Sequence, residues 1–383
     1  MLRGGIRVEP TVHILVTTDT LTSVWGYTRE LVTSLVTHGH RVTLVSMGEI
    51  PLPEQTAWIE GLYGLDYRPT AFRLEWMQEG EEDLADSTEY LRSVIDDVEP
   101  DILHLGQFCY GSLETSVPRV VVAQGDLITW SQIVHDKDPK ESRWSGWYRD
   151  VVTRGLAAAN TVVAPSGWML ETLRETYGEP ARGCVIYNGR NPIFFNPYVN
   201  KEESVLAVGR LWDAGKQLYL LTQHKHPLPV CIVGADQPLQ APRIPIRADV
   251  KVDVGDGSVA LKGPQTENQL RLLYSRAAMY AATARYEPFG MPALEAAFSR
   301  CAIVANDIPS LREIWGDDAV YFRTNDGASL AEAIRALKDD RELCRTYANR
   351  AYQRARNRFT AKRMMDDYVR LYRTLIAAKA EAA

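Results

Sequence analysis

The chain is poor in cysteine and has neither a long apolar run nor an excess of positive charge. Its 383 residues include five cysteines, which are scattered and never have Cys-x-x-Cys spacing. We therefore expect reduced cysteines in the protein core and a cytoplasmic protein. The N-terminus shows no apolar secretory segment, and no run approaches the ~20 apolar residues that cross a bilayer. Membrane association is accordingly expected to be peripheral at most.

The charge balance is slightly acidic, with 43 lysines and arginines against 49 aspartates and glutamates and a net charge of -6. Proteins that bind nucleic acids favour a basic surface, so we expect no nucleic-acid partner. Two His-x-His pairs, His38/His40 and His224/His226, have no nearby carboxylates or cysteines that would complete a metal site. We therefore expect no bound metal. The hydrophobic content of 45% and charged content of 24% are those of an ordinary globular protein.

Short apolar segments alternate with amphipathic ones along almost the whole chain. This alternation predicts an α/β protein whose parallel sheets are covered by helices on both faces. One of the helical segments is 28–37, which Gly39 closes as a C-terminal cap. The expected strands are 12–16, 42–45, 102–105, 120–123, 161–164, 185–187, 205–208, 230–233, 278–282, 302–305 and 320–322.

The regular alternation breaks at residues 188–203, where Asn-Gly-Arg-Asn-Pro and Phe-Asn-Pro-Tyr interrupt any periodic pattern. We place the domain boundary there, with an N-terminal domain of residues 1–190 and a C-terminal domain of residues 191–361. The last stretch, 340–383, is helical in pattern and rich in arginine. Its charges are interpreted as a solvated helix face and not as a binding patch.

The most informative segment is 285–295, Arg-Tyr-Glu-Pro-Phe-Gly-Met-Pro-Ala-Leu-Glu. Pro292 suits the first turn of a helix, so Glu287 is expected in a strand-to-helix loop and Glu295 about one turn into the helix. The carboxyl end of a parallel strand is where α/β folds bind ligands. A helix N-terminus there suits diphosphates and sugar hydroxyls. The alternative is a solvated loop glutamate and an exposed helix glutamate.

This segment resembles the Glu-x7-Glu signature of retaining glycosyltransferases of family 4. The resemblance implies the GT-B architecture, two facing Rossmann-like domains with parallel sheets and an interdomain cleft. It also implies transfer of a sugar from a nucleoside diphosphate sugar, most often a uridine diphosphate sugar, to a hydroxyl acceptor by front-face displacement. No cofactor or metal is expected. By resemblance alone, the terminal helix at 362–383 should pack back on the N-terminal domain, which would bind the acceptor.

The resemblance assigns roles within the Glu-x7-Glu segment. Glu295 looks like the residue that accepts hydrogen bonds from the ribose hydroxyls, and Glu287 looks like the residue that faces the transferred sugar. A carboxylate suits a vicinal diol because it offers two acceptor oxygens. Gly290 permits close backbone approach to the sugar. The donor-binding residues implied by the resemblance, besides Glu295, are Phe289, Gly290, Met291 and Leu294.

A second polar segment, Gly-Arg-Leu-Trp-Asp-Ala-Gly-Lys at 209–216, follows the expected strand 205–208. In the family this pattern supplies the arginine and lysine that hold the diphosphate, here Arg210 and Lys216. Fixed cations stabilise the charge that develops on a departing diphosphate more in the transition state than in the ground state. The alternative is two surface cations beside a turn.

The first domain departs from the family pattern at two places. The first loop, which often carries Gly-Gly, reads Asp-Thr-Leu-Thr-Ser-Val-Trp-Gly at 19–26, where Thr22 and Ser23 can offer hydroxyls. A histidine commonly follows the fourth strand, but Gln124 stands there, and an amide can bond a sugar hydroxyl without carrying a proton. Gln124 is counted with the catalytic residues, and Asp126 with Thr22 and Ser23 on the acceptor side.

Further residues allow both a functional and a packing interpretation. His104 ends its strand and points toward the cleft, yet such a histidine is more often packed in a core. Trp130, Trp144 and Trp147 could form a platform for an acceptor sugar or pack structurally. Ser310 and Glu313 match a loop of the family and also make a capping box at a helix start.

The principal alternative is a non-catalytic nucleotide-sugar-binding or sensor protein of the same fold, since Gln124 and the missing Gly-Gly depart from the catalytic pattern. A nicotinamide-dependent dehydrogenase would need Gly-x-Gly-x-x-Gly after an early strand, and the first expected strand-to-helix turn lacks it. The sequence leaves open the donor base and sugar, the linkage formed and the oligomeric state. It also leaves open whether the acceptor is a carbohydrate, a lipid-linked molecule or another small molecule.

Overall fold

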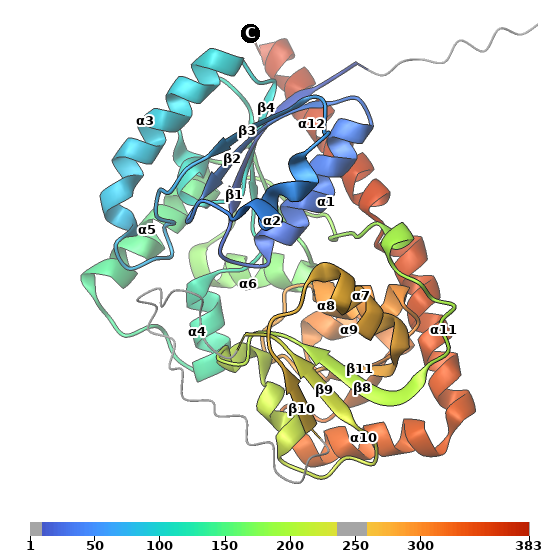
Figure 1. Ribbon diagram of the computed structural model, residues 1–383. Helices are drawn as coiled ribbons and strands as arrows, with labels where there is room; N and C mark the ends of the chain where they lie inside the picture. Colours follow the sequence, from blue (N-terminus) through green and yellow to red (C-terminus); the bar gives the residue numbers. More distant parts are fainter. Residues whose placement is uncertain (1–9, 236–258, 383) are drawn as a thin grey trace, which may run out of the picture.

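The computed structural model describes residues 10–235 and 259–382, which form two α/β domains stacked one above the other in Figure 1. Each domain is built on one parallel sheet. Successive residues of a strand point to opposite faces of its sheet, and both faces are covered. In β1, Leu15 joins one buried cluster of the first domain, whereas Ile14 and Val16 join the other.

Within the described ranges, the first sheet has seven strands in the order β3-β2-β1-β4-β5-β6-β7. Its strands are β1 His13–Asp19, β2 Arg41–Met47, β3 Leu65–Pro69, β4 Ile102–Leu105, β5 Arg119–Val122, β6 Thr161–Ala164 and β7 Gly183–Val185. Its helices are α1 Val24–Thr37, α2 Pro53–Thr56, α3 Gly80–Val98, α4 Leu127–His135, α5 Arg143–Ala158 and α6 Gly167–Tyr177, with the 3-10 turns η1 Ala57–Ile59 and η2 Cys109–Ser112.

The second sheet, over the part of the chain that the structure describes, has six strands in the order β10-β9-β8-β11-β12-β13. These are β8 Glu202–Val208, β9 Val230–Val233, β10 Val259–Lys262, β11 Ala277–Ala282, β12 Ala302–Asn306 and β13 Val320–Phe322. The helices are α7 Glu267–Arg276, α8 Met291–Phe298, α9 Pro309–Trp315, α10 Gly327–Asp339 and α11 Arg341–Arg358. The 3-10 turns are η3 Pro192–Phe194, η4 Ala214–Lys216, η5 Leu218–Thr222 and η6 Gly316–Asp318.

The expected α/β class and parallel sheets are confirmed, and each expected strand has a counterpart within a few residues. Two strands, β3 and β10, were not predicted. Both lie at sheet edges, and most of their side chains are partly or fully exposed. An edge strand needs no continuous apolar run, so Leu-Asp-Tyr-Arg-Pro in β3 carries no strand signal.

The chain passes between the domains twice, and the two passages pair with each other. Arg190 N–H donates to the carbonyl of Phe359 (3.1 Å), and Ala361 N–H donates to the carbonyl of Arg190 (2.9 Å). A Cβ atom on Gly189 would lie 2.3 Å from the Thr360 carbonyl oxygen, so only glycine fits there. The Asn-Gly pair of the predicted boundary therefore serves a close backbone crossing.

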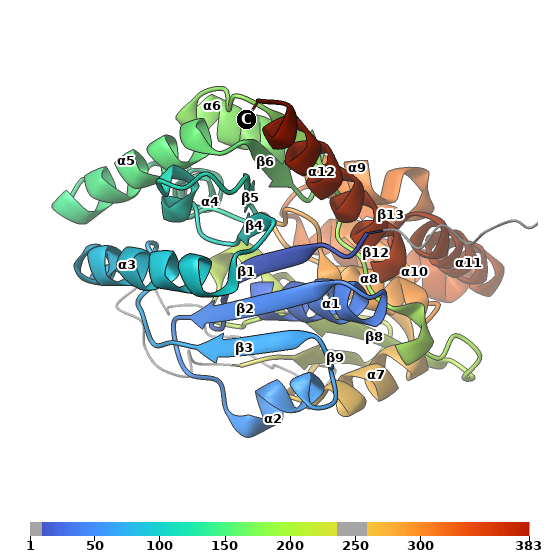
Figure 2. The ribbon, with the colours of Figure 1, turned by 90° about the horizontal axis from the view of Figure 1, so that it is seen from above.

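The last helix, α12 Ala361–Ala382, leaves the second domain and contacts α1 of the first. Figures 1 and 2 show α12 running back over the first domain. Met364, Tyr368 and Tyr372 are fully buried and belong to the first-domain cluster around Ile14 and Leu31. The terminal helix thus completes a face of the first sheet. Its arginines are mostly paired with acidic residues of the same helix, as in Arg363–Asp367.

All five cysteines lie in the described ranges as free thiols, and Cys109 and Cys301 are buried. Burial raises the pKa of both thiols. Among residues 10–235 and 259–382, no helix combines the length and apolar character needed to cross a membrane.

Candidate active site

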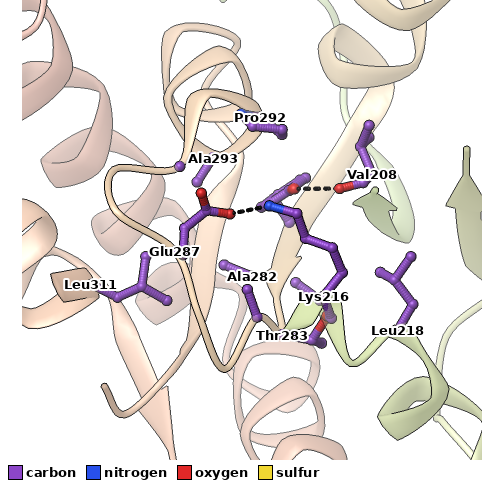
Figure 3. A pocket seen from close by; sticks show the side chains of 13 residues that line it. Val208, Lys216, Leu218, Ala282, Thr283, Glu287, Pro292, Ala293 and Leu311 are labelled. Atoms are coloured by element: carbon purple, nitrogen blue, oxygen red, sulfur yellow. Dashed lines mark hydrogen bonds and ion pairs between the residues drawn. The ribbon is translucent and has the colours of Figure 1, made fainter. Parts of the chain in front are cut away.

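Two neighbouring parallel strands of the second domain, β8 and β11, deliver the predicted donor residues to one place. The loop after β8 carries Arg210 and Lys216, and the loop after β11 carries Glu287. Lys216 and Glu287 line one pocket together with Tyr280, Thr283 and Gly290 (Figure 3). Side chains separated by 71 positions therefore meet where the sequence analysis expected them.

Lys216 and Glu287 form an ion pair across this pocket, with Lys216 Nζ 2.7 Å from Glu287 Oε2 (Figure 3). The two side chains are 23% and 17% exposed, so the pair is accessible from one side only. The Thr283 hydroxyl donates to the Lys216 carbonyl (2.7 Å) and fixes the lysine backbone to the end of β11. A cation is thus held beside the carboxylate that was assigned to the sugar.

Arg210 lies on the same loop and is held by Asp213. Arg210 Nη2 donates to Asp213 Oδ2 (2.6 Å), and the guanidinium lies 5.1 Å from the centre of the Trp212 ring. Asp213 is buried and also accepts from Gly215 N–H (2.9 Å). Burial raises the pKa of Asp213, but Arg210 and Lys216 outweigh it and the net shift is downward. Asp213 was not singled out from sequence, although an aspartate two residues before glycine is a turn signal.

The start of α8 forms the third side of the pocket. Gly290 precedes the helix with φ of +93°, a left-handed conformation that favours glycine. A Cβ on Gly290 would also lie 3.4 Å from Glu287 Cγ, so glycine keeps this approach open. Met291 and Pro292 then begin the helix, with Pro292 in the first turn as expected. The free amides at this end are available to an anion or to hydroxyls.

Two residues of the predicted donor-binding set do not present side chains to the pocket. Leu294 is fully buried in the second-domain core, because packing of α8 on the sheet turns that side chain inward. The Phe289 side chain is also buried, and its ring lies 5.4 Å from that of Phe359. Phe289 can therefore contact a ligand only through its backbone.

Glu295 lies further along α8, and its carboxylate is paired with an arginine of the interdomain segment. Arg190 Nε donates to Glu295 Oε1 (2.8 Å), and the Glu295 side chain is 14% exposed. Burial and the neighbouring Glu295 charge raise the pKa of Tyr274. The sequence analysis missed Arg190, because nothing local connects it with a residue 105 positions away.

Two of the first-domain candidates, Gln124 and Thr22, are hydrogen-bonded to neighbouring side chains. Gln124 Nε2 donates to Asn188 Oδ1 (3.1 Å), and Asn188 Nδ2 donates back to Gln124 Oε1 (2.8 Å). Thr22 donates its hydroxyl to Asp19 Oδ2 (2.9 Å). Ser23 is exposed at the start of α1 and makes no side-chain cap there. Of these residues, Ser23 has the most accessible side chain.

Asp126 is not a free acceptor-side carboxylate, and its assignment there is corrected. It is buried and caps α4, accepting from Thr129 N–H (2.7 Å). Its other oxygen accepts from the hydroxyls of Tyr148 (2.9 Å) and Tyr177 (2.5 Å). Since both oxygens are occupied by first-domain donors, Asp126 organises this side of the site from within.

His104 and Trp144 are packed. His104 is 1% exposed, with its ring nitrogens 3.3 Å from the Tyr27 hydroxyl and 2.6 Å from the Tyr372 hydroxyl. Burial lowers the pKa of His104 to about 3. Trp144 donates its indole N–H to the Met77 carbonyl (2.6 Å). Trp130 and Trp147 pack against the same first-domain core, so for these tryptophans the structure favours the packing interpretation.

Glu313 joins the two domains and does not complete a capping box. Residue Ile308 caps α9, and both Glu313 oxygens accept backbone N–H groups at the start of α6, from Gly167 (2.7 Å) and Trp168 (2.9 Å). A carboxylate suits the positive end of a helix. The capping-box interpretation is therefore wrong, because the first domain offers α6 as a better partner.

The loop that carries Glu287 is likewise docked on the first domain. Tyr286 is buried there, and its hydroxyl accepts from Asp126 N–H (3.1 Å) and lies 3.0 Å from the Thr129 hydroxyl. Arg285 pairs with Asp136 through both carboxylate oxygens, at 2.7 and 2.8 Å. Glu287 is thus positioned by contacts of its two preceding residues with α4 and its end.

No group of three histidine, cysteine, aspartate or glutamate side chains gathers as a metal site within 10–235 and 259–382. Comparisons with known proteins agree with the two-domain fold. The model described as glycosyl transferases group 1 matches residues 196–354, and the glycosyltransferase family 4 model matches residues 24–193.

A curated relative and two solved structures extend this agreement over most of the chain. Alpha-maltose-1-phosphate synthase of Mycolicibacterium smegmatis is 25% identical over 305 residues, covering 72% of this chain and 76% of that protein. Sucrose-phosphate synthase of Thermosynechococcus elongatus has a TM-score of 0.75 at 17% identity, covering 96% of this chain and all of that one. Anabaena HepE, solved with UDP-glucose, has a TM-score of 0.69 at 14% identity, covering 97% and 100%. The chain therefore belongs to the group 1, family 4 glycosyltransferases, enzymes of the GT-B fold that transfer glycosyl groups.

Proposed function

We propose that the protein transfers a sugar from a uridine diphosphate sugar to a hydroxyl acceptor, with retention of configuration at the anomeric carbon. The observation that carries the proposal is the Lys216–Glu287 pair in the pocket beside the start of α8. In this pair, the cation proposed to bind the diphosphate and the carboxylate proposed to face the sugar lie within hydrogen-bonding distance of each other. Anabaena HepE, which has the same fold, was solved in complex with UDP-glucose, and this favours the uridine series for the present chain.

In the proposed donor complex, Lys216 and Arg210 face the diphosphate. Both cations are held by carboxylates, at 2.7 Å from Glu287 and 2.6 Å from Asp213, so they are oriented before a ligand arrives. Their charge stabilises the phosphate oxygen as the bond to the sugar breaks, which lowers the barrier more than it strengthens donor binding. The amides of Phe289, Gly290 and Met291 contact the sugar hydroxyls, and Glu295 receives the ribose.

Retention follows in this proposal from displacement on one face of the sugar. The acceptor hydroxyl approaches from the side on which the diphosphate leaves, and a departing phosphate oxygen takes the hydroxyl proton. Glu287 then stabilises the positive charge that builds on the sugar ring. Gln124 bonds a sugar hydroxyl, since an amide has two N–H donors and two acceptor lone pairs and the pair with Asn188 uses one of each.

The acceptor is a carbohydrate, a lipid-linked molecule or another small molecule that carries a hydroxyl. We expect transfer without a metal cofactor, because the two fixed cations occupy the place of metal charge at the diphosphate. We also expect the protein to work in the cytoplasm, in keeping with its five unpaired cysteines.

A donor screen tests the proposal. Uridine and guanosine diphosphate sugars are compared for thermal stabilisation, where a ligand at 100 times its dissociation constant adds about 2.7 kcal/mol. Nucleotide release with candidate acceptors, measured with and without a chelator, then establishes turnover, and proton NMR of the first product gives the anomeric configuration. Stabilisation by guanosine donors alone would overturn the uridine assignment. An inverted product would overturn the mechanism.

A further inference from the structure

Arg190 is a buried cation that contacts three carboxylates from three helices. Its Nη1 donates to Glu30 (2.5 Å), its Nε to Glu295 (2.8 Å), and its Nη2 to Glu267 (3.3 Å). The Arg190 side chain is 8% exposed. An arginine fork can bond several oxygens at once in fixed directions, which a lysine cannot. Each nitrogen of this guanidinium is therefore committed to a different carboxylate.

Charge explains why the cluster is stable although it is buried. Burial lowers the pKa of Arg190, but the charges of Glu295, Glu30 and Glu267 outweigh it and the net shift is upward. Glu267 also pairs with Arg29 and Arg271, and its pKa is lowered in spite of burial. Arg29 and Arg271 thus join Arg190 in balancing the charge of the three carboxylates.

The three carboxylates belong to both domains. Glu30 lies on α1 of the first domain, Glu267 begins α7, and Glu295 lies on α8 of the second domain. In Figure 1, α7 and α8 lie beneath α1, and Arg190 comes from the segment that passes between the two domains. Asn191 N–H also donates to Glu30 (2.9 Å), so both Glu30 oxygens hold this segment.

We propose that Arg190 is a positioning residue for nucleotide binding: it orients Glu295 toward the ribose diol and ties that orientation to α1 of the first domain. Arg190 Nε donates a hydrogen bond to Glu295 Oε1 (2.8 Å). This bond fixes the rotation of the carboxylate and leaves its second oxygen, Oε2, to accept from a ribose hydroxyl. The inference rests on the proposed ribose role of Glu295 and adds the residue that prepares it.

Comparing two nucleotides separates this role from general structural support. UDP and 2′,3′-dideoxy-UDP differ only in the ribose hydroxyls, and calorimetry gives the ratio of their affinities for each variant. Because hydrogen bonds to a charged group are the stronger ones, the wild-type protein should prefer UDP by about tenfold or more. Arg190→Met should bring that ratio close to one, as should Glu295→Gln. A variant that merely loosens the fold would weaken both nucleotides and keep their ratio.

Matched variants complete the experiment. Arg271→Met removes another cation from Glu267 without touching Glu295, and it should keep the wild-type ratio. The double variant Arg190→Met/Glu295→Gln should have the same ratio as either single variant, since both act on one interaction. Where Arg190→Met fails to fold, Arg190→Lys keeps the charge but loses the fork, and its ratio should fall below that of the wild type.

The outcomes distinguish the inference from the function on which it rests. A wild-type ratio near one would reject the ribose role of Glu295 and overturn both. A wild-type ratio of tenfold that persists in Arg190→Met and Arg190→Lys would overturn the role of Arg190 alone. Preference for guanosine nucleotides would reject the uridine assignment, and the same ratio measured with GDP and dideoxy-GDP would then decide for or against Arg190.

Discussion

The second-domain side of the candidate site and the first-domain side use their polar residues differently. On the second-domain side, Lys216 and Glu287 line a pocket and are paired across it. On the first-domain side, Asp126 is consumed by three hydrogen bonds inside its own domain, and Thr22 bonds Asp19. The second-domain side thus presents polar side chains to the pocket, whereas the polar residues on the first-domain side hold the backbone in place.

Removing the cations of the second-domain side should have the largest effect on transfer. We expect Lys216→Ala and Arg210→Ala each to lower kcat by about 10²-fold or more, because fixed charges at a leaving group act mainly in the transition state. Steady-state kinetics with the donor identified by screening measures this. Lys362→Ala, which removes an exposed cation from its pair with Asp366 on α12, is the control and should be neutral. Normal turnover in both Lys216→Ala and Arg210→Ala would remove the diphosphate role from these two residues.

Replacing Asp126 should instead show up as lost stability. Asp126→Ala leaves the hydroxyls of Tyr148 and Tyr177 and the Thr129 amide without their acceptor, so we expect a loss of about 2–3 kcal/mol in the free energy of unfolding. Chemical denaturation gives this value, and the acceptor KM of the remaining folded protein should match the wild type. Ser23→Ala, on the same side but exposed, should leave stability unchanged. An increased acceptor KM with normal stability would restore Asp126 to the acceptor site.

The two glutamates should divide between binding and rate. Glu295→Gln should weaken free nucleoside diphosphate by about tenfold, the loss of a charge-assisted hydrogen bond. Glu287→Gln should leave that affinity within about twofold and reduce kcat instead, since it faces the group that reacts. Calorimetry and steady-state kinetics on the same two variants test the division. Equal nucleotide affinity in Glu295→Gln and the wild type would contradict the ribose assignment.

The same contrast explains what the sequence could predict. The Glu-x7-Glu segment is local: a strand end, a positive-φ glycine and a proline in the first helical turn place Glu287 in the loop between β11 and α8 within eleven residues. The apolar runs of central strands are equally local signals. By contrast, Glu313 reaches α6 across 146 positions, and Tyr286 reaches Asp126 across 160. Such contacts depend on how two folded domains meet, and no spacing along the chain encodes that.

Leu294 and Asp126 show the same limit inside one domain. Leu294 sits in the middle of the donor motif, but helical periodicity turns it into the core. Asp126 follows a strand as a binding residue would, yet the hydroxyls of Tyr148 on α5 and Tyr177 on α6 donate hydrogen bonds to its carboxylate. The sequence places both residues next to the site, but only their packed neighbours decide whether a side chain is free.

The smallest expected effect concerns Gln124, which pairs with Asn188 beside the interdomain crossing. Gln124→Ala should cost about 0.5–1.5 kcal/mol in transition-state stabilisation, the value of one neutral hydrogen bond.

The Gln124 amide does not titrate, and burial lowers the pKa of His104 to about 3, so His104 stays neutral through the working pH range. The pH profile of kcat should therefore lack a step from either residue near the ~6.5 of an ordinary histidine. Gln124→His should introduce such a step, with activity changing as pH falls through that value, if position 124 faces the sugar. A Gln124→His enzyme whose pH profile and donor KM both match the wild type would mean that Gln124 serves only to hold Asn188 at the interdomain crossing.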